Sequence, residues 1–404
     1  MRILQINAVY DIASTGRSTA ELHRYLKSHG HQSWVAAMNV PNCDEFFHLG
    51  NKIENRIHNL LSHITGRQGS FSTLSTRQLI QFIGEKNPDV VHLRVLHSNC
   101  INIKMLLSFL AVRNIPVVIT LHDCWYFTGH CCYFTGAQCE RWKNGCGHCP
   151  ELHTWNRSWF FDRTQKNLET KRKLFSGIKK LAVVGVSDWV TGFVKDSILK
   201  DAYLIKRIYN WIDLGTFQPK ERNKIRAELG LKDSFTIICI AQNWSVLKGL
   251  DDVITLAKRM SDCKILLVGT CPEEFLPLPE NVISVGCTTS TAQLADYYSA
   301  ADVFFNPSLQ ETFGKVTAES LACGTPVVGY GVTATIELVK PGCGYLIAPY
   351  DIDGAVEKIN QVKMQGKDTF ISACREFAVK TFNRECLIEE NISVYKQLID
   401  ARYD

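Results

Sequence analysis

The 404-residue chain lacks several features that would assign it to a special class of protein. It has no apolar run of the ~18 residues that a membrane-spanning helix needs. Its first residues do not resemble a secretory signal, because the charged residues Asp11 and Arg17 come too early for an apolar stretch. Low-complexity tails and solenoid-type repeats are also missing. These absences predict a globular, cytoplasmic protein that is soluble or peripheral at the inner membrane.

Strong net charge is missing too. The overall charge of +5 is not typical of nucleic-acid-binding proteins, so no nucleic-acid partner is expected. The excess is local: between Arg157 and Arg226, 16 Lys or Arg stand against 7 Asp or Glu, which leaves +9. Two interpretations stay open, solvated helix faces or attraction to an anionic membrane surface.

Short apolar runs alternate with amphipathic helical segments along the whole chain. Strands are predicted at RILQINAV, QSWVAAM, VVHL, PVVITLHD and LAVVGVS, and in a second series at FTIICIAQ, KILLVG, VISVG, ADVFFNPS and TPVVGY. Continuous runs rich in Val, Ile and Leu are typical of parallel strands that are buried on both faces. The sequence therefore predicts two Rossmann-like α/β domains facing across a cleft, over residues 1–211 and 212–375. Residues 376–404 are predicted to be helices that pack back toward the N-terminal domain.

The most informative stretch is NPSLQETFGKVTAESLACGTPVVGYGVTATIELV, residues 306–339. A strand is predicted to end near Asn306, and a helix to follow the loop that carries Glu311 and to run to Cys323. Free N–H groups at the start of such a helix suit a diphosphate. Glu311 and Glu319 offer carboxylates to the hydroxyls of a sugar or ribose ring. From the spacing of the two glutamates alone, the alternative is that both lie on a solvent-exposed face of the helix.

This stretch resembles the signature of retaining glycosyltransferases of the GT-B fold, specifically glycosyltransferase family 4. The resemblance implies that Glu311 contacts hydroxyls of the transferred sugar and that Glu319 holds the ribose of the nucleotide. It also implies that the backbone at Phe313 and Gly314 approaches the sugar and diphosphate, with Lys315 in the same donor-binding set.

A second element of the same family follows the first strand of the second domain. Lys248 and Gly249 in QNWSVLKGLDD match its Lys-Gly element, whose lysine pairs with donor phosphate. An ammonium there offsets the negative charge that builds on the departing diphosphate. The arginine that the family usually places before this lysine is missing, because the stretch reads Ala241-Gln242-Asn243-Trp244. Asn243 is therefore expected to assist in binding the donor.

In the first domain the resemblance concerns two residues. Gly16, in the segment STGR after the first strand, is matched to the family's glycine-rich loop near donor and acceptor. His122, in TLHD at the end of a predicted strand, is matched to the family's histidine near the reacting centre. A structural role is the alternative for a lone histidine at a strand end.

Sixteen cysteines are many for a chain that is expected in a reducing compartment. Six of them fall in residues 122–152, which we call the cysteine-rich segment. The other ten are scattered and are interpreted as packing residues. A similar insertion occurs in some bacterial exopolysaccharide and capsule glycosyltransferases of this family.

The spacing within the cysteine-rich segment suits a metal. Cys146-x-x-Cys149 has the spacing of metal ligands, and Cys131 or Cys132 together with Cys139 completes a set for a structural zinc. Reduced packing thiols and disulfide or redox control are the alternatives. Two histidines are alternative ligands, His130 and His148.

The expected function is transfer of a sugar from a nucleotide-sugar donor to a saccharide or lipid-linked saccharide, with retention of configuration, in cell-surface polysaccharide synthesis. The residues expected to be catalytic are His122, Lys248 and Glu311. We identify no Asp-x-Asp element as the mark of a metal-dependent diphosphate site, so no cofactor for catalysis is expected. A nucleotide-sugar epimerase of the same architecture and a non-catalytic binding protein are the alternatives.

Overall fold

A computed structural model of the chain describes residues 1–231, 233–288 and 290–401. It divides into two compact units: unit 1 holds Met1–Ile208 and the chain from Ile388 onward, and unit 2 holds Tyr209–Leu387. The predicted domain boundary at 211/212 lies just inside unit 2. The predicted end of the second domain, residue 375, falls within a helix that unit 2 contains whole. Residues 402–404 of the predicted C-terminal helices lie outside the described residues.

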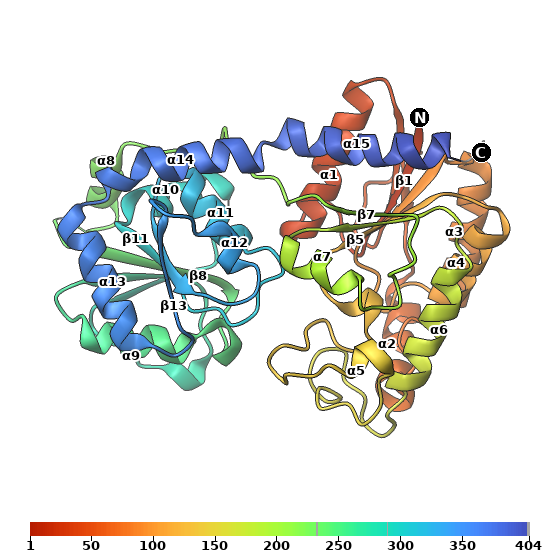
Figure 1. Ribbon diagram of the computed structural model, residues 1–404, viewed down its shortest axis with the longest axis horizontal. Helices are drawn as coiled ribbons and strands as arrows, with labels where there is room; N and C mark the ends of the chain where they lie inside the picture. Colours follow the sequence, from red (N-terminus) through yellow and green to blue (C-terminus); the bar gives the residue numbers. More distant parts are fainter. Residues whose placement is uncertain (232, 289, 402–404) are drawn as a thin grey trace. The chain divides into compact units, whose positions relative to one another are not determined.

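Unit 1 is built on a seven-stranded parallel sheet of order β3-β2-β1-β4-β5-β6-β7. The strands are β1 (Arg2–Ile6), β2 (Gln32–Ala37), β3 (Phe46–His48), β4 (Val90–Leu93), β5 (Val117–Leu121), β6 (Leu181–Gly185) and β7 (Leu204–Arg207). The helices are α1 (Ala13–Ser28), α2 (Lys52–Thr65), α3 (Thr73–Lys86), α4 (Ile103–Val112), the 3₁₀ turn η1 (Trp125–Phe127), α5 (Arg141–Asn144), α6 (Thr164–Ser176) and α7 (Asp188–Val194). Figure 1 shows the cysteine-rich segment, in yellow, as irregular loops around α5 that leave the sheet after β5.

Unit 2 is built on a six-stranded parallel sheet of order β10-β9-β8-β11-β12-β13. The strands are β8 (Thr236–Asn243), β9 (Lys264–Thr270), β10 (Val282–Gly286), β11 (Val303–Asn306), β12 (Val327–Tyr330) and β13 (Gly344–Ile347). The helices are α8 (Arg222–Glu228), η2 (Val246–Lys248), α9 (Leu250–Arg259), η3 (Glu273–Phe275), α10 (Thr291–Ala300), α11 (Lys315–Ala322), α12 (Thr335–Leu338), α13 (Ile352–Gln365) and α14 (Asp368–Phe382). A final helix, α15 (Arg384–Asp400), begins in unit 2 and continues in unit 1.

The two parallel sheets with helical crossovers confirm the predicted α/β class with Rossmann-like units. All ten predicted strands are present, and β3, β7 and β13 are additional. Each additional strand lies at the edge of its sheet, is three or four residues long and is only partly buried. An edge strand has one neighbour instead of two, so it needs no continuous apolar run, which is the signal by which the central strands are found.

Each sheet has its own apolar core, because central strands such as β4, β5, β11 and β12 are buried along their whole length. No helix within the described residues combines the length and the apolar character that a bilayer crossing would require.

The strand order of each sheet indicates where its functional polar residues should lie. In open α/β sheets, ligands bind outside the carboxyl ends of the strands, at the point where the strand order reverses. That point lies between β1 and β4 in unit 1 and between β8 and β11 in unit 2. The loops after these four strands are therefore where functional side chains are expected.

Candidate active site

In unit 2, the loops after β8 and β11 bring Lys248 and Glu311 together. Lys248 ends the η2 turn, and its Nζ lies 2.6 Å from Glu311 Oε1. The same Nζ lies 3.4 Å from Ser308 Oγ. Both charged groups are accessible: the Lys248 side chain is 38% exposed and that of Glu311 is 14% exposed. The ion pair thus occupies the point where the strand order of this sheet reverses.

Gly249 allows the two loops to approach so closely. Its φ of +75° is a left-handed backbone conformation that favours glycine. A Cβ at this position would lie 2.5 Å from the carbonyl oxygen of Pro307. The Leu309 N–H also donates to the Leu247 carbonyl over 3.1 Å. The glycine next to Lys248 is therefore required by packing against the β11 loop as well as by the turn.

The helix α11 begins four residues beyond Glu311. Gly314, with φ +82°, is the residue before the helix, and it offers no side chain to cap the first N–H groups. Such N–H groups have no acceptor within the helix and carry the positive end of its dipole. The loop before the helix is anchored, because the Glu311 N–H donates to Thr333 Oγ1 over 3.1 Å. Glu311 therefore lies in the loop that leads directly into the start of α11, and Lys248 approaches it from the β8 loop.

Glu319 and Phe313 occupy more enclosed positions than Glu311. Glu319, in the second turn of α11, is 3% exposed and lies beside the Tyr298 hydroxyl. Burial and this carboxylate together raise the pKa of Tyr298 well above its usual value. Phe313 is buried against the rings of Tyr209 and Phe382, at centroid distances of 5.8 and 5.6 Å. The contact of Glu319 with a ribose stays a prediction.

Two further predicted donor residues lie at the surface of unit 2. Asn243 is exposed at the carboxyl end of β8, and Lys315 is half-buried in the first turn of α11. The Trp244 side chain beside Asn243 is buried and its indole N–H donates to the Val268 carbonyl over 3.0 Å.

An Asp-x-Asp sequence does occur in this unit, at Asp351 and Asp353, contrary to the expectation from the sequence. Asp351 caps α13 by accepting the Gly354 N–H over 2.8 Å. Asp353 forms a surface ion pair with Arg259. Both carboxylates are thus engaged in helix capping and surface pairing.

In unit 1, the residue that sequence reasoning missed is Arg94. It follows β4 directly, is 2% exposed, and donates from Nη2 to Ser18 Oγ over 2.8 Å and from Nη1 to Gln5 Oε1 over 3.3 Å. Burial lowers the pKa of its guanidinium to about 10, so the group stays charged at neutral pH. The Arg94 Nη2 lies 3.3 Å from His122 Nε2. A single arginine after a strand carries no sequence signal, because its burial depends on residues from three other elements.

His122 and the residue after it continue β5 into the cysteine-rich segment. Asp123 accepts from His97 Nε2 over 2.9 Å and from the Trp125 N–H over 2.8 Å. Burial alone would raise the pKa of Asp123, but these two partners outweigh it and the pKa is lowered. His122 therefore has the buried Arg94 guanidinium as one neighbour and precedes the partly buried Asp123 carboxylate in the chain.

The prediction that Ser14–Arg17 form a glycine-rich loop is wrong, because these residues belong to the first turns of α1. The loop lies just before them, where Asp11 and Ala13 have φ values of +56° and +52°. The Asp11 N–H donates to the Gly16 carbonyl over 3.0 Å. A Cβ on Gly16 would lie 3.2 Å from the Asp11 nitrogen. Gly16 thus permits the loop to fold back onto the helix.

Two groups of side chains in unit 1 have ligand chemistry for a metal. Within the described residues, His97, Asp123 and Cys132 are the one group whose ligand atoms all lie within 4.8 Å of one another. The second group is formed by the predicted zinc ligands, which line one small cavity together: Cys131, Cys139, Cys146 and Cys149. Burial raises the pKa of Cys131 and of Cys149 to about 12, so without a cation these thiols are neutral and poorly nucleophilic.

Comparison with known families matches both halves of the chain. Residues 15–215 match the model described as Glycosyltransferase Family 4, and residues 221–373 match the model described as Glycosyl transferases group 1.

Individual relatives are more distant. D-inositol 3-phosphate glycosyltransferase of Mycobacterium sp. (strain KMS) is 28% identical over 217 residues, which cover 50% of this chain and 49% of that protein. N-acetyl-alpha-D-glucosaminyl L-malate synthase of Bacillus anthracis is 26% identical over 212 residues, covering 48% of this chain and 54% of that protein. The chain thus spans about half the length of the curated relatives that it matches.

Solved structures resemble the chain over nearly its full length. Sucrose-phosphate synthase from Thermosynechococcus elongatus has a TM-score of 0.71 and 17% identity, covering 99% of this chain and 100% of that one. HepE from Anabaena in complex with UDP has a TM-score of 0.67 and 17% identity, covering 98% and 100%. HepE has also been solved in complex with UDP-glucose. At these identities the likeness shows a shared fold.

Proposed function

Because the chain belongs to glycosyltransferase family 4 and has the GT-B fold, we propose that it transfers a sugar from a nucleotide-sugar donor to a saccharide or lipid-linked saccharide acceptor. The observation that carries this proposal is the ion pair of Lys248 Nζ and Glu311 Oε1, 2.6 Å apart, beside the open start of α11. The proposal includes retention of the anomeric configuration and a role in cell-surface polysaccharide synthesis, such as capsule or exopolysaccharide.

The donor is proposed to bind to unit 2, and two facts support this. Ammonium and helix N–H groups at one strand-order reversal match the charge of a diphosphate. HepE, which shares the fold, binds UDP and UDP-glucose. A uridine nucleotide is therefore the first donor class to test.

Lys248 and Glu311 are proposed to exchange partners when the donor binds. The diphosphate takes the Lys248 ammonium, and Glu311 is released to accept hydrogen bonds from sugar hydroxyls. As the bond to the leaving group breaks, Lys248 and the first N–H groups of α11 stabilise the charge on the diphosphate. An ion pair that is 38% exposed on the lysine side contributes at most ~1 kcal/mol, so a doubly charged ligand can displace it readily.

The remaining predicted donor contacts are proposed in secondary roles. Glu319 is expected to hold the ribose hydroxyls from the second turn of α11. Phe313 and Gly314 are expected to contribute backbone groups, and Asn243 and Lys315 to line the approach to the phosphates. Asn243 lies in the stretch where the family has an arginine, so Lys248 is expected to carry more of the phosphate binding.

The acceptor is proposed to bind to unit 1, near His122. The His122 ring lies next to Arg94, with its Nε2 3.3 Å from the Arg94 Nη2. A neutral imidazole can donate a hydrogen bond to a sugar hydroxyl or accept one from it, whichever substrate carries the hydroxyl. Gly16, two residues from the Ser18 hydroxyl that holds Arg94, belongs to the same region.

A peripheral contact of unit 1 with the inner membrane surface is also proposed. Exposed apolar residues of α2 repeat on one face, at Ile53, Ile57 and Leu60. The exposed Trp159 lies near the end of α2, since its backbone N–H donates to the His63 carbonyl over 2.7 Å. Apolar and aromatic groups beside cations suit an anionic lipid surface.

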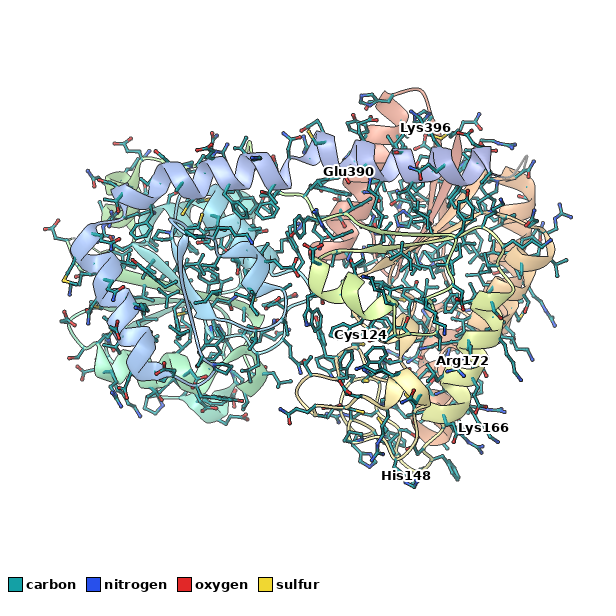
Figure 2. The ribbon with its side chains drawn as sticks, in the orientation of Figure 1. Cys124, His148, Lys166, Arg172, Glu390 and Lys396 are labelled. Carbon is teal, nitrogen blue, oxygen red and sulfur yellow. The ribbon has the colours of Figure 1, made fainter. Side chains whose placement is uncertain are left out.

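The cations proposed for this contact line a cavity of about 500 Å³ in the same unit, and they include Arg67, Lys104, Arg163, Lys166 and Lys173. Lys166 lies on the outer side of unit 1 in Figure 2. Vesicles with anionic lipid should co-sediment the protein at low salt, and a variant with Ile53 and Ile57 changed to Ser should bind less. Equal binding to neutral vesicles would contradict this contact.

The decisive experiment on the reaction is a panel of UDP- and GDP-sugars with the purified full chain. Donor binding is measured by thermal shift, and transfer by product formation with saccharide acceptors present and absent. Retention is read from the anomeric proton coupling of the product compared with that of the donor. Failure of every nucleotide sugar to stabilise the chain would overturn the assignment, and conversion without an acceptor would favour an epimerase.

A further inference from the structure

The cysteine-rich segment has a feature that sugar transfer does not use. Cys131, Cys139, Cys146 and Cys149 come from three separate stretches, before α5 and after it, and they line one cavity of about 10 Å³. A space of this volume suits one ion or water molecule. All sixteen cysteines lie within the described residues and are free.

The backbone between Cys146 and Cys149 bends at His148, and we call this bend the Cys146–Cys149 turn. Gly147 and His148 between them have φ values of +129° and +48°. The Arg141 guanidinium holds this turn, because its Nη1 donates to the carbonyls of Gly147 and His148 over 2.8 and 2.5 Å. These contacts fix the conformation of the turn.

Backbone N–H groups support the sulfurs and the turn. The Gly129 N–H donates to Cys146 Sγ over 3.3 Å, a contact that stabilises a thiolate ligand. The Cys149 N–H donates to Asp162 Oδ2 over 2.8 Å, which fixes the other end of the turn. Gly129 has room for this contact only as glycine, since a Cβ would lie 2.1 Å from the Thr164 carbonyl oxygen.

His130 also lines the cavity, but its hydrogen bonds assign it another role. The Trp125 indole can only donate, and it donates to Gln68 Oε1 over 2.7 Å. Gln68 must then turn its NH₂ group to His130 Nδ1, 2.7 Å away, which accepts. The proton of the neutral ring is therefore on Nε2, and no lone pair faces a metal. His148 is exposed at the far end of the segment (Figure 2).

A buried lysine lies next to these sulfurs, and burial lowers its pKa to about 7. Lys171 of α6 is 2% exposed, and its ammonium donates to the carbonyls of Trp125 and Thr128 over 2.5 and 3.0 Å. It lies close enough to Cys146 and Cys131 for electrostatic interaction. Burial of a charge is costly unless it is compensated. Four thiolates around a divalent cation carry a net charge of −2, which would supply that compensation.

The competing group in the same unit already has another explanation. In the group His97, Asp123 and Cys132, the carboxylate accepts from the His97 ring and from a backbone N–H, so each of its oxygens already accepts one hydrogen bond. Of the two groups, the cysteine group is the one that offers four sulfurs, and zinc commonly binds four thiolates in a tetrahedral site.

We propose that Cys131, Cys139, Cys146 and Cys149 bind one zinc ion. Zinc–sulfur bonds of ~2.3 Å would draw the four sulfurs together and close the cavity. With four protein ligands the ion has no open position, so its role is structural. It joins the stretch after η1, the stretch before α5 and the turn after it, in a segment with little regular secondary structure.

Two neighbouring cysteines provide a matched test. Cys131 and Cys132 are each 6% exposed, but only Cys131 lines the cavity. The full chain, purified without metal-affinity steps, should contain about one zinc by mass spectrometry of the metal. C131A and C146S should lose it, and C132A should keep it. Zinc lost from C132A and kept in C131A would overturn the proposal in favour of the His97 group.

A second measurement covers variants that fail to fold. Cobalt(II) added to the metal-free full chain should give the charge-transfer and ligand-field absorption of a tetrahedral site with four sulfurs, and zinc should displace it. A chain that takes up neither metal overturns the proposal. So does a metal-free chain whose denatured, unreduced form has fewer than sixteen free thiols, because that result indicates disulfides.

Discussion

At the scale of single residues, the donor site depends on Lys248 more than the family pattern would suggest. The stretch where an arginine is expected, Ala241–Trp244, holds none, and its Asn243 is exposed and uncharged. Lys248 is then the cation that stands next to Glu311, 2.6 Å away, at the open start of α11. Loss of this ammonium should therefore affect the reaction far more than the fold.

The first prediction concerns K248M. Removal of one group that stabilises the leaving diphosphate should lower kcat about 100- to 1,000-fold. The ion pair is partly exposed and contributes at most ~1 kcal/mol to folding, so the melting temperature should change little. Initial rates and thermal melts measure the two effects.

The control for K248M is K258M on the exposed face of α9. It removes the same charge from the same unit and should leave kcat unchanged. A K248M enzyme with normal kcat would contradict the role in leaving-group stabilisation.

At the scale of secondary-structure elements, contacts between neighbouring elements hold the loops in place. Gly249 joins η2 to α9 and packs against Pro307 of the β11 loop, 2.5 Å from a would-be Cβ. In unit 1, His58 of α2 binds Ser72 at the start of α3, with Nδ1 2.6 Å from the hydroxyl oxygen. Each contact couples two elements through one residue that tolerates little change.

G249A should separate the Lys248 turn from the β11 loop. The left-handed backbone alone costs about 1–2 kcal/mol for a non-glycine residue. The clash with Pro307 should add about 1–3 kcal/mol. We expect a lower melting temperature and a loss of activity, measured on the same samples.

G230A separates the two costs, because Gly230 also has a left-handed backbone, with φ +66°, but no atom within 4 Å of a would-be Cβ. It should show the backbone cost alone and keep its activity. Equal losses in both variants would mean that packing against Pro307 does not matter.

The His58 contact predicts a pH dependence of stability. Burial lowers the pKa of His58 to about 4, while an unfolded histidine titrates near ~6.5. Below pH ~6.5 His58 is protonated in the unfolded chain but stays neutral in the folded chain. The free energy of unfolding, which is highest above this pH, therefore decreases as the pH falls toward 4. The contribution reaches up to about 3 kcal/mol.

Urea unfolding at a series of pH values measures this effect. H58Q should flatten the dependence, although it also loses the contact with Ser72 and is less stable throughout. H48Q, at the exposed end of β3, should leave the dependence unchanged. An unchanged slope in H58Q would contradict the assignment. Burial also lowers the pKa of His130 to about 4, so part of the slope should persist.

At the scale of the whole molecule, each unit has its own sheet, its own core and its own group of functional side chains. Unit 2 holds Lys248, Glu311 and the start of α11, and unit 1 holds Arg94, His122 and the cysteine-rich segment. Ligands of the two units should therefore have separable effects.

Hydrogen exchange with and without UDP tests this separation. Protection should increase in unit 2, over residues 243–249 and 306–319, because a bound nucleotide stabilises the segments that it contacts. The sheet of unit 1 should exchange as before. Protection that appears only in unit 1 would contradict the assignment of the donor to unit 2.

How much of this molecule was predictable depends on the range of the interactions involved. The central strands, the parallel α/β class and the loop–helix segment with Glu311 and Gly314 were predictable, because each is written in a contiguous stretch. The edge strands β3, β7 and β13 were not, because they lack a continuous apolar run. Gly16 was assigned to a loop because a glycine after a strand is an ordinary turn signal, whereas α1 begins before it.

The sequence by itself determined which residues carry charge at strand ends, since a strand, a turn and a helix start are local. Only the tertiary structure decided that Lys248 faces Glu311, that Gly249 must pack on Pro307, and that Arg94 is buried beside His122. These are contacts between residues from 28 to 63 positions apart, and neither spacing nor periodicity encodes such distances. The physical reason is that parallel strands bring their carboxyl ends to one edge only after the crossover helices have packed.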